Sequence, residues 1–364
     1  MNKKIGNIEI NTPPEGYKTS LKSRLIVAGV LLITAVPTFV LGGWFYFFAI
    51  MAFLLIAIAE VIRAPRKKYN WFVYVATYTI ILSFVYWMFF KGNMDSYLDY
   101  LADPSQFPDG FSISLDQHYM NFEVSVIGIA ASLLVYCVVG ILDKNFGLDD
   151  IAYFFFMSLL VGLGFQSFYF IRFYPVEAAA YPNPLYVGAT WGGQAYGPEL
   201  IDNNFFKYFG SFELLLFVFI APMFSDIAAY FGGVYFGKHK LNERISPKKT
   251  WEGFYWGIIV GFIASAAFGL ILAATGHPIL PFLTIDKWYY IVLIALVEPI
   301  LGTVGDLSFS LIKRYYDIKD YGNILRGHGG ILDRADSVIF SSIGAVIILV
   351  LMKNGWNFLI SFYA

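Results

Sequence analysis

Long apolar runs recur along the whole chain, and they constrain its fold more than any other feature of the sequence. A run of about 18 or more apolar residues can cross the hydrocarbon core of a bilayer as a helix. We expect about nine such spans. Their approximate residues are 25–42, 44–62, 71–90, 124–142, 151–173, 209–231, 254–275, 288–312 and 336–353.

The composition agrees with a protein that lies in a membrane. Of the 364 residues, 58% are hydrophobic and only 14% are charged, whereas soluble domains carry about 25% charged residues. The chain therefore lacks the polar side chains to cover a water-facing surface of its size. It is predicted to be an all-α integral membrane protein, a polytopic helical bundle. Its one cysteine, Cys137, excludes a disulfide framework and a thiolate metal site, and is expected to be a small buried hydrophobe.

The distribution of cations predicts the orientation. Cytosolic loops of membrane proteins carry an excess of Lys and Arg. If the N-terminus is cytosolic, about four fifths of the 25 Lys and Arg residues fall on the cytosolic side. We therefore expect a cytosolic N-terminus and an outside C-terminus.

The chain divides into three parts. Residues 1–23 are polar and predict a short, poorly ordered cytosolic tail. Residues 24–207 hold the first membrane helices and two outer loops rich in aromatic residues, about 91–122 and 174–207. Residues 208–364 hold the remaining helices and two cytosolic loops, 237–253 and 313–335.

Ionisable residues near the membrane are concentrated in the last of these parts. Before residue 208 they are few, chiefly Glu60, whereas Glu213, Asp226, Glu298 and Asp306 lie within or at the edge of later spans. A carboxylate at such a depth is costly and usually serves an ion, a substrate or a proton path. We therefore expect the reactive groups in the C-terminal half.

The segment between the last two spans has the densest set of reactive residues. Helical spacing would place Asp306, Ser310, Lys313 and Asp317 along one face, because steps of three and four residues stay in register. This face would present acid, hydroxyl, cation and acid in a line from the membrane to the cytosolic surface.

A glycine turn and two further acids follow. Gly329 and Gly330 adjoin His328, and glycines let backbone N–H groups approach a phosphate closely. Asp333 and Asp336 are three residues apart, so both can point at one metal ion, and their hard oxygens suit Mg²⁺. The simpler interpretation is that the two acids cap the following helix and offset its dipole.

A second cluster lies in residues 225–253. Here Ser246 and Thr250 flank the pair Lys248 and Lys249, a mixture of hydroxyls and cations that suits phosphate oxygens. Positive-inside topology and attraction to anionic headgroups would also account for the cations.

Other features have structural interpretations. Gly253, Gly257 and Gly261 repeat at four-residue spacing, which is typical of closely packed helices. His239 and His277 have no partner pattern and are expected to be structural.

One long pattern of fixed spacings carries a family resemblance. It reads Ser310-x-Ile312-Lys313-Arg314, four residues, Lys319-Asp320-x-Gly322, then His328-Gly329-Gly330-Ile331-x-Asp333-Arg334-x-Asp336. This pattern closely resembles the signature of the phosphatidate cytidylyltransferases (CDP-diacylglycerol synthases), and the segment 246–253 is similar to a second block of that family. Arg326 and Ala335 depart from the usual signature residues, without removing an acid.

The resemblance implies transfer of the cytidylyl group of CTP to phosphatidic acid, giving CDP-diacylglycerol and pyrophosphate for phospholipid biosynthesis. It implies metal-assisted, in-line attack of the lipid phosphate on the α-phosphorus, with Mg²⁺ and room for a second cation. The implied catalytic residues are Asp306, Lys313, Asp333 and Asp336, and the implied metal ligands are Asp226, Asp306, Asp333 and Asp336. The implied substrate-binding residues are Ser246, Lys248, Lys249, Thr250, Ser310, Arg314, Lys319, His328, Gly329, Gly330 and Arg334.

The expected partners are CTP, phosphatidic acid and membrane lipids, with no nucleic acid, and a homodimer is compatible with the sequence. The expected location is a bacterial inner membrane, with the active site on the cytosolic face. Three alternatives stay open: a CTP-dependent lipid kinase that transfers the γ-phosphoryl group, a cytidylyltransferase for another lipid phosphate, and an ion-coupled transporter. The transporter is disfavoured because the sequence has no internal repeat.

Overall fold

Helices form most of the chain, as the apolar runs predict. The computed structural model describes residues 3–5, 8–10, 37–106, 126–180, 188–324 and 329–354. Seven helices in this part of the chain are long and apolar enough to cross a membrane. They are α2 (Gly43–Arg63), α3 (Trp71–Ala102), α5 (Leu148–Ala180), α7 (Ser211–Phe236), α8 (Trp251–Ala274), α9 (Trp288–Tyr315) and α10 (Leu332–Asn354).

Two of the nine predicted spans differ from these seven. The predicted span 124–142 is the apolar helix α4 (Val126–Leu142), which has 17 residues. The predicted span 25–42 lies mostly outside the described residues, so a total of nine stays a prediction. The structure is that of an all-α membrane protein.

Some helices extend well beyond the predicted spans. Helix α3 continues to Ala102 and α5 to Ala180, where the sequence predicts outer loops from about residues 91 and 174. An apolar run marks only the part of a helix that lies in hydrocarbon. The backbone hydrogen bonds of a helix can continue past it in polar surroundings, and the apolar pattern gives no signal of this.

Short elements connect the helices. The described residues contain three antiparallel strand pairs: β1–β2 (Lys3–Ile5, Ile8–Ile10), β3–β4 (Thr190–Trp191, Gln194–Ala195) and β5–β6 (Lys240–Asn242, Ser246–Thr250). The remaining short helices are η1 (Pro104–Gln106), α6 (Pro198–Ile201), η3 (Phe206–Gly210) and η4 (Ile285–Lys287). The pair β1–β2 lies where the sequence predicts a poorly ordered tail.

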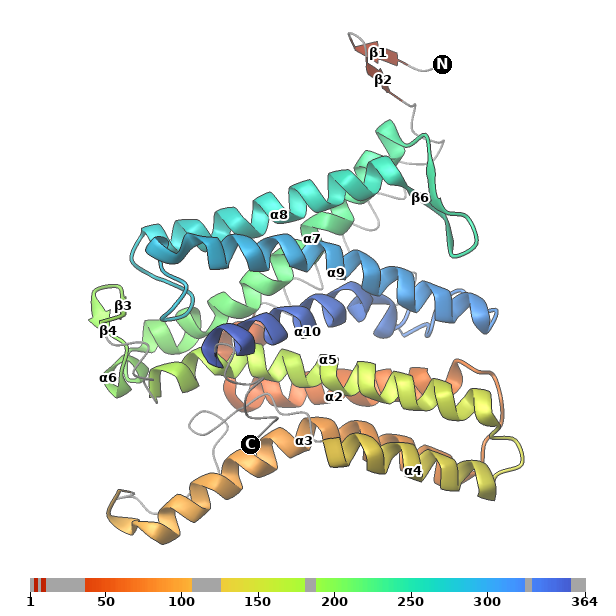
Figure 1. The fold of residues 1–364 in the computed structure, drawn as a ribbon, viewed down its shortest axis with the longest axis horizontal. Helices are drawn as coiled ribbons and strands as arrows, with labels where there is room; N and C mark the ends of the chain where they lie inside the picture. The colour runs from red at the N-terminus through yellow and green to blue at the C-terminus, as the bar shows by residue number, and fades with distance from the viewer. Residues whose placement is uncertain are drawn as a thin grey trace.

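The long helices form two groups that share one core (Figure 1). Helices α7, α8, α9 and α10 lie on one side, and α2, α3, α4 and α5 on the other. Helix α10 contacts α5, α7 and α9, and so joins the groups. The connections α2–α3, α4–α5 and α9–α10 and the hairpin β5–β6 all lie at the same end of the bundle, on the right of Figure 1.

The outward surface of α4 corrects one expectation. Cys137 is exposed rather than buried, and its neighbours Leu133, Leu134 and Val138 are exposed as well. In a bilayer, lipid chains cover such a surface, so an apolar residue in a span need not face the protein interior.

Candidate active site

The two reactive segments of the sequence meet at the end of the bundle that carries the α9–α10 connection and the hairpin β5–β6. Lys249 on β6 pairs with the Asp306 carboxylate on α9, 57 residues away in the chain. The Ser337 hydroxyl on α10 lies within hydrogen-bonding distance of Asp226 Oδ2 on α7 (3.2 Å) and of Asp336 Oδ1 (3.3 Å). Side chains from three helices and one hairpin therefore converge.

A cleft of about 570 Å³ lies between the hairpin and these helices. Lys248, Lys249 and Thr250 line it from the hairpin side, and Asp226 and Asp306 line it from α7 and α9. Its volume is within the range of small-molecule sites. Cations and carboxylates that face each other across a cleft of this kind suit a ligand carrying phosphates and a metal ion.

The hairpin is held firmly to the start of α8. Thr250 is the N-cap of α8, and its hydroxyl accepts a hydrogen bond from the Gly253 N–H (3.2 Å). Glu252 accepts hydrogen bonds from the N–H groups of Lys238 (3.0 Å) and His239 (3.2 Å) and lies 2.6 Å from the His239 ring Nδ1. Thr250 and Glu252 thus fix the base of the hairpin, and His239 has a structural contact with Glu252.

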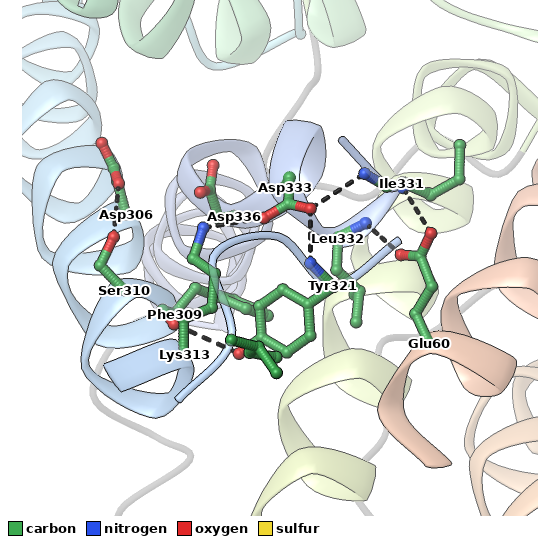
Figure 2. A network of polar contacts seen from close by, with 12 residues as sticks. Glu60, Asp306, Phe309, Ser310, Lys313, Tyr321, Ile331, Leu332, Asp333 and Asp336 are labelled. Carbon is green, nitrogen blue, oxygen red and sulfur yellow. Dashed lines mark hydrogen bonds and ion pairs between the residues drawn. The ribbon is translucent and has the colours of Figure 1, made fainter. Parts of the chain in front are cut away.

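Asp333 organises the turn before α10 (Figure 2). Its Oδ1 accepts a hydrogen bond from Lys313 Nζ (2.8 Å), and its Oδ2 accepts from the N–H groups of Tyr321 (2.8 Å) and Gly330 (2.9 Å). The ion pair is nearly enclosed, since the side chains of Lys313 and Asp333 are 10% and 5% exposed. All three partners lie outside α10, so Asp333 holds the turn that precedes the helix rather than capping the helix itself.

Tyr321 closes one side of this turn. Burial, and then the nearby charges of Asp333 and Asp336, raise the pKa of the Tyr321 phenol. The phenol therefore stays protonated and donates to the Phe309 carbonyl oxygen (3.2 Å). Its ring lies 5.6 Å from Lys313 Nζ, so the cation contacts an aromatic face as well as a carboxylate.

The predicted acid–hydroxyl–cation–acid face is only partly present. Ser310 Oγ donates to Asp306 Oδ1 (3.3 Å) and Lys313 lies one turn on, but α9 ends at Tyr315. Asp317 has a φ of 50° and so leaves the helix, which makes its predicted place on this face wrong.

Other predicted substrate-binding residues have varied surroundings. The Arg314 guanidinium donates to the carbonyl oxygens of Ile245 (3.2 Å) and Ile318 (3.3 Å), and so ties the hairpin to the end of α9. Lys319 and Arg334 are exposed and Ser246 is half-buried. His328 lies outside the described residues.

Glu60 is among the residues of this region that the sequence-based set of site residues omits. Glu60, at the end of α2, accepts hydrogen bonds from the N–H groups of Ile331 and Leu332, both at 2.9 Å (Figure 2). The available signal was its charge in an otherwise apolar span. Its partners are backbone groups some 270 residues away, and no side-chain pattern reveals such a pairing.

The carboxylates of the site are the right kind of ligand for a hard metal ion, although they are not already arranged around one. Within the described residues, no three His, Cys, Asp or Glu side chains are close enough to hold a metal ion. Asp226, Asp306 and Asp336 nevertheless interact electrostatically with one another. Carboxylate and hydroxyl oxygens are the ligands that Mg²⁺ prefers. Asp333 differs, because both of its oxygens accept hydrogen bonds from protein groups.

Comparison with known proteins identifies the family. Residues 22–352 match the cytidylyltransferase family. The phosphatidate cytidylyltransferase of Bacillus subtilis is 27% identical over 320 residues, which cover 88% of this chain and 94% of that protein. Those of Mycobacterium leprae and Staphylococcus epidermidis are 41% and 39% identical over 36% and 35% of this chain, and over 39% and 45% of their own lengths. The family match spans most of the sequence and includes every carboxylate of the site, so the chain belongs to the cytidylyltransferase family.

Proposed function

We propose that this protein transfers the cytidylyl group of CTP to phosphatidic acid, forming CDP-diacylglycerol and pyrophosphate. The observation that carries the proposal is the cleft in which Lys248 and Lys249 face Asp226 and Asp306. Membership of the cytidylyltransferase family and the names of the relatives support the same reaction. They favour it over γ-phosphoryl transfer and over transport.

The chemistry needs positioning and charge neutralisation more than a protein nucleophile. An oxygen of the lipid phosphate is already ionised, and it attacks the α-phosphorus of CTP. A new P–O bond forms, and the bond to the β-phosphate oxygen breaks with its electron pair leaving on pyrophosphate. Both reactants are polyanions that repel each other, so groups that hold them in line supply most of the catalysis.

The cations of the cleft supply the first part of that neutralisation. Lys248 and Lys249 bind the phosphates of CTP, and Lys249 exchanges its Asp306 partner for a phosphate oxygen. Ser246, Thr250 and Ser310 are the proposed hydroxyl donors to the substrates, and the exposed Lys319 and Arg334 are the proposed further cations. The predicted role of His328 falls on a residue outside the described part of the chain. Arg314 keeps the hairpin beside α9.

The carboxylates supply the second part. Asp226, Asp306 and Asp336 would hold Mg²⁺, and Asp333 would join them only if Lys313 turned from it toward a substrate phosphate. When bound, the metal would neutralise charge on the phosphates and on the leaving pyrophosphate. A second cation stays a prediction from the sequence. Gly329 and Gly330 keep the turn before α10 close to this set.

The site is proposed to face the cytosol in a bacterial inner membrane, where CTP is available. Positive-inside topology and the gathering of the basic loops at one end of the bundle support this side. A homodimer stays a prediction from the sequence.

Label transfer tests the reaction. Purified protein, phosphatidic acid and Mg²⁺ are incubated with CTP labelled on the α- or on the γ-phosphorus. We expect lipid-borne label from the α position only, with the γ label released as pyrophosphate. Label from the γ position only, with diacylglycerol or a polyprenol as acceptor, would establish a lipid kinase instead. Substrate flux into sealed vesicles without chemical change would establish a transporter.

A further inference from the structure

Glu60 connects the N-terminal half of the molecule to the turn before α10. It lies near the end of α2, only 2% of its surface is exposed, and its two carboxylate oxygens accept from two successive amides. Oε1 accepts from Ile331 and Oε2 from Leu332, each at 2.9 Å (Figure 2). The carboxylate thus acts as a two-pronged clamp on the start of α10.

The physical reason for such a clamp lies in the helix end. The first amides of a helix have no carbonyl partners inside it, and their dipoles favour a negative charge. A nearby Ser, Thr, Asp or Asn usually supplies the cap. Here a carboxylate from another helix does so, and the charge-assisted hydrogen bonds offset part of the cost of burying it.

Two glycines of the signature make room for this carboxylate. A Cβ on Gly330 would collide with Glu60, since Oε1, Cδ (2.5 Å) and Oε2 (2.7 Å) are the three nearest atoms. A Cβ on Gly322 would also meet the carboxylate, with Cδ at 3.0 Å. Gly329 differs, because its φ is 84° and its nearest neighbour is Asp333. The nearby Glu60 carboxylate therefore explains why position 330 is a glycine, and the positive φ explains why position 329 is one.

The clamped turn carries the residues of the candidate site. The Gly330 amide donates to Asp333, Asp333 binds Lys313, and Asp336 follows one turn later on α10. A shift at residues 330–332 would move all of them. Glu60 does not line the cleft and is separated from it by this turn.

We propose that Glu60 is a positioning residue for cytidylyl transfer: it fixes the turn before α10, and through it Asp333, Lys313 and Asp336. The inference rests on the proposed function for its kinetic part. Its structural part, the clamp itself, can be measured without any reaction.

The first test is Glu60→Gln, which keeps the size of the side chain but turns one acceptor into a donor that faces an N–H group. We expect kcat to fall about 10- to 100-fold, as is typical when a group that orients site residues is removed, with little change in KM for CTP. The unfolding temperature in detergent should fall only modestly, because one of the two buried amides keeps its acceptor. Glu213→Gln is the matched control, because Glu213 lies in α7 at the opposite end of the bundle and contacts Trp191; its kcat should not change.

The second test uses the collision with Gly330. Gly330→Ala should lower activity in the wild type and add little in a Glu60→Ala background, because the colliding carboxylate is gone. Gly329→Ala should lower activity in both backgrounds, because its positive φ stays strained without Glu60.

Hydrogen–deuterium exchange of a peptide covering residues 329–336 reports the clamp directly. Faster exchange there in Glu60→Gln, with the α8 peptide unchanged, is the expected result. A Glu60→Gln variant with the wild-type kcat would overturn the proposal. It would also be overturned if kcat fell only because the variant unfolds globally, and if the effects of the Gly330 and Glu60 substitutions simply added. If the wild type transferred no cytidylyl group, the proposed function would fail, and the clamp would stand or fall on the exchange result.

Discussion

The individual carboxylates of the candidate site have different surroundings, although the sequence pattern gives no reason to distinguish them. Asp306 pairs with Lys249 at the edge of the cleft, and the two side chains are 24% and 29% exposed. Asp333 is nearly enclosed and accepts hydrogen bonds from Lys313 and from two backbone amides. Removing a buried charge leaves its partner unpaired, whereas a part-exposed charge can be replaced by water or ligand. The two acids should therefore respond differently to the same substitution.

We expect Asp306→Asn and Asp333→Asn each to lower cytidylyl transfer by about 100-fold or more. Only Asp333→Asn should also lower stability, by about 3–5 kcal/mol, because it leaves Lys313 buried without a counter-charge. Label transfer and thermal unfolding in detergent measure the two effects. Ser308→Ala, on the exposed side of α9, is the control. Equal unfolding temperatures for the two Asn variants would contradict this division of roles.

At the scale of elements, the contact between α7 and α8 sets the place of the basic hairpin. The glycines at 253, 257 and 261 lie against the carbonyl oxygens of Ala229, Ser225 and Ala221, so the two antiparallel backbones nearly touch. Helix α8 begins directly after β6, and therefore the hairpin moves with it. The close packing predicted for these glycines is confirmed.

Gly253→Ala should disturb this contact, because its Cβ would stand 2.6 Å from the Ala229 carbonyl oxygen, a backbone atom that cannot turn away. Overpacking of this kind costs about 1–3 kcal/mol. Both the unfolding temperature and the rate of transfer should fall, since Thr250 and the lysines shift with α8. Gly197→Ala, where a Cβ meets nothing within 4 Å, should leave both unchanged. A fully active Gly253→Ala would show that the hairpin does not depend on this contact.

At the scale of the whole molecule, the chain is one bundle with distinct ends. The basic hairpin, the turn before α10 and the end of α2 lie together, and the connection between α8 and α9 lies at the opposite end. Glu60 and the packing of α10 on α5 join the N-terminal helices to the site. The first half therefore supports the site as well as facing lipid.

The predicted orientation can be checked by cysteine labelling. In a Cys137→Ser background, which removes the one natural cysteine, the exposed positions Asn242 and Asp286 are changed singly to cysteine. A membrane-impermeant maleimide should label Asp286→Cys in intact cells and Asn242→Cys only after permeabilisation. The reverse pattern would invert the topology and place the site outside the cell.

The sequence by itself determined the membrane class, most of the spans and the family, because these depend on local apolar runs and on fixed spacings. It also predicted Asp226, Asp306, Asp333 and Asp336 as site residues, but not their separate surroundings. Only the tertiary structure decided that Lys249 meets Asp306, that Asp333 is held by two amides, and that Glu60 clamps the start of α10. The Lys249–Asp306 and Glu60 contacts join residues far apart in the chain. The contacts of Asp333 and Glu60 involve backbone N–H groups, which every residue except proline carries. A linear pattern has no means to encode them, because the packing of the helices alone brings the groups together.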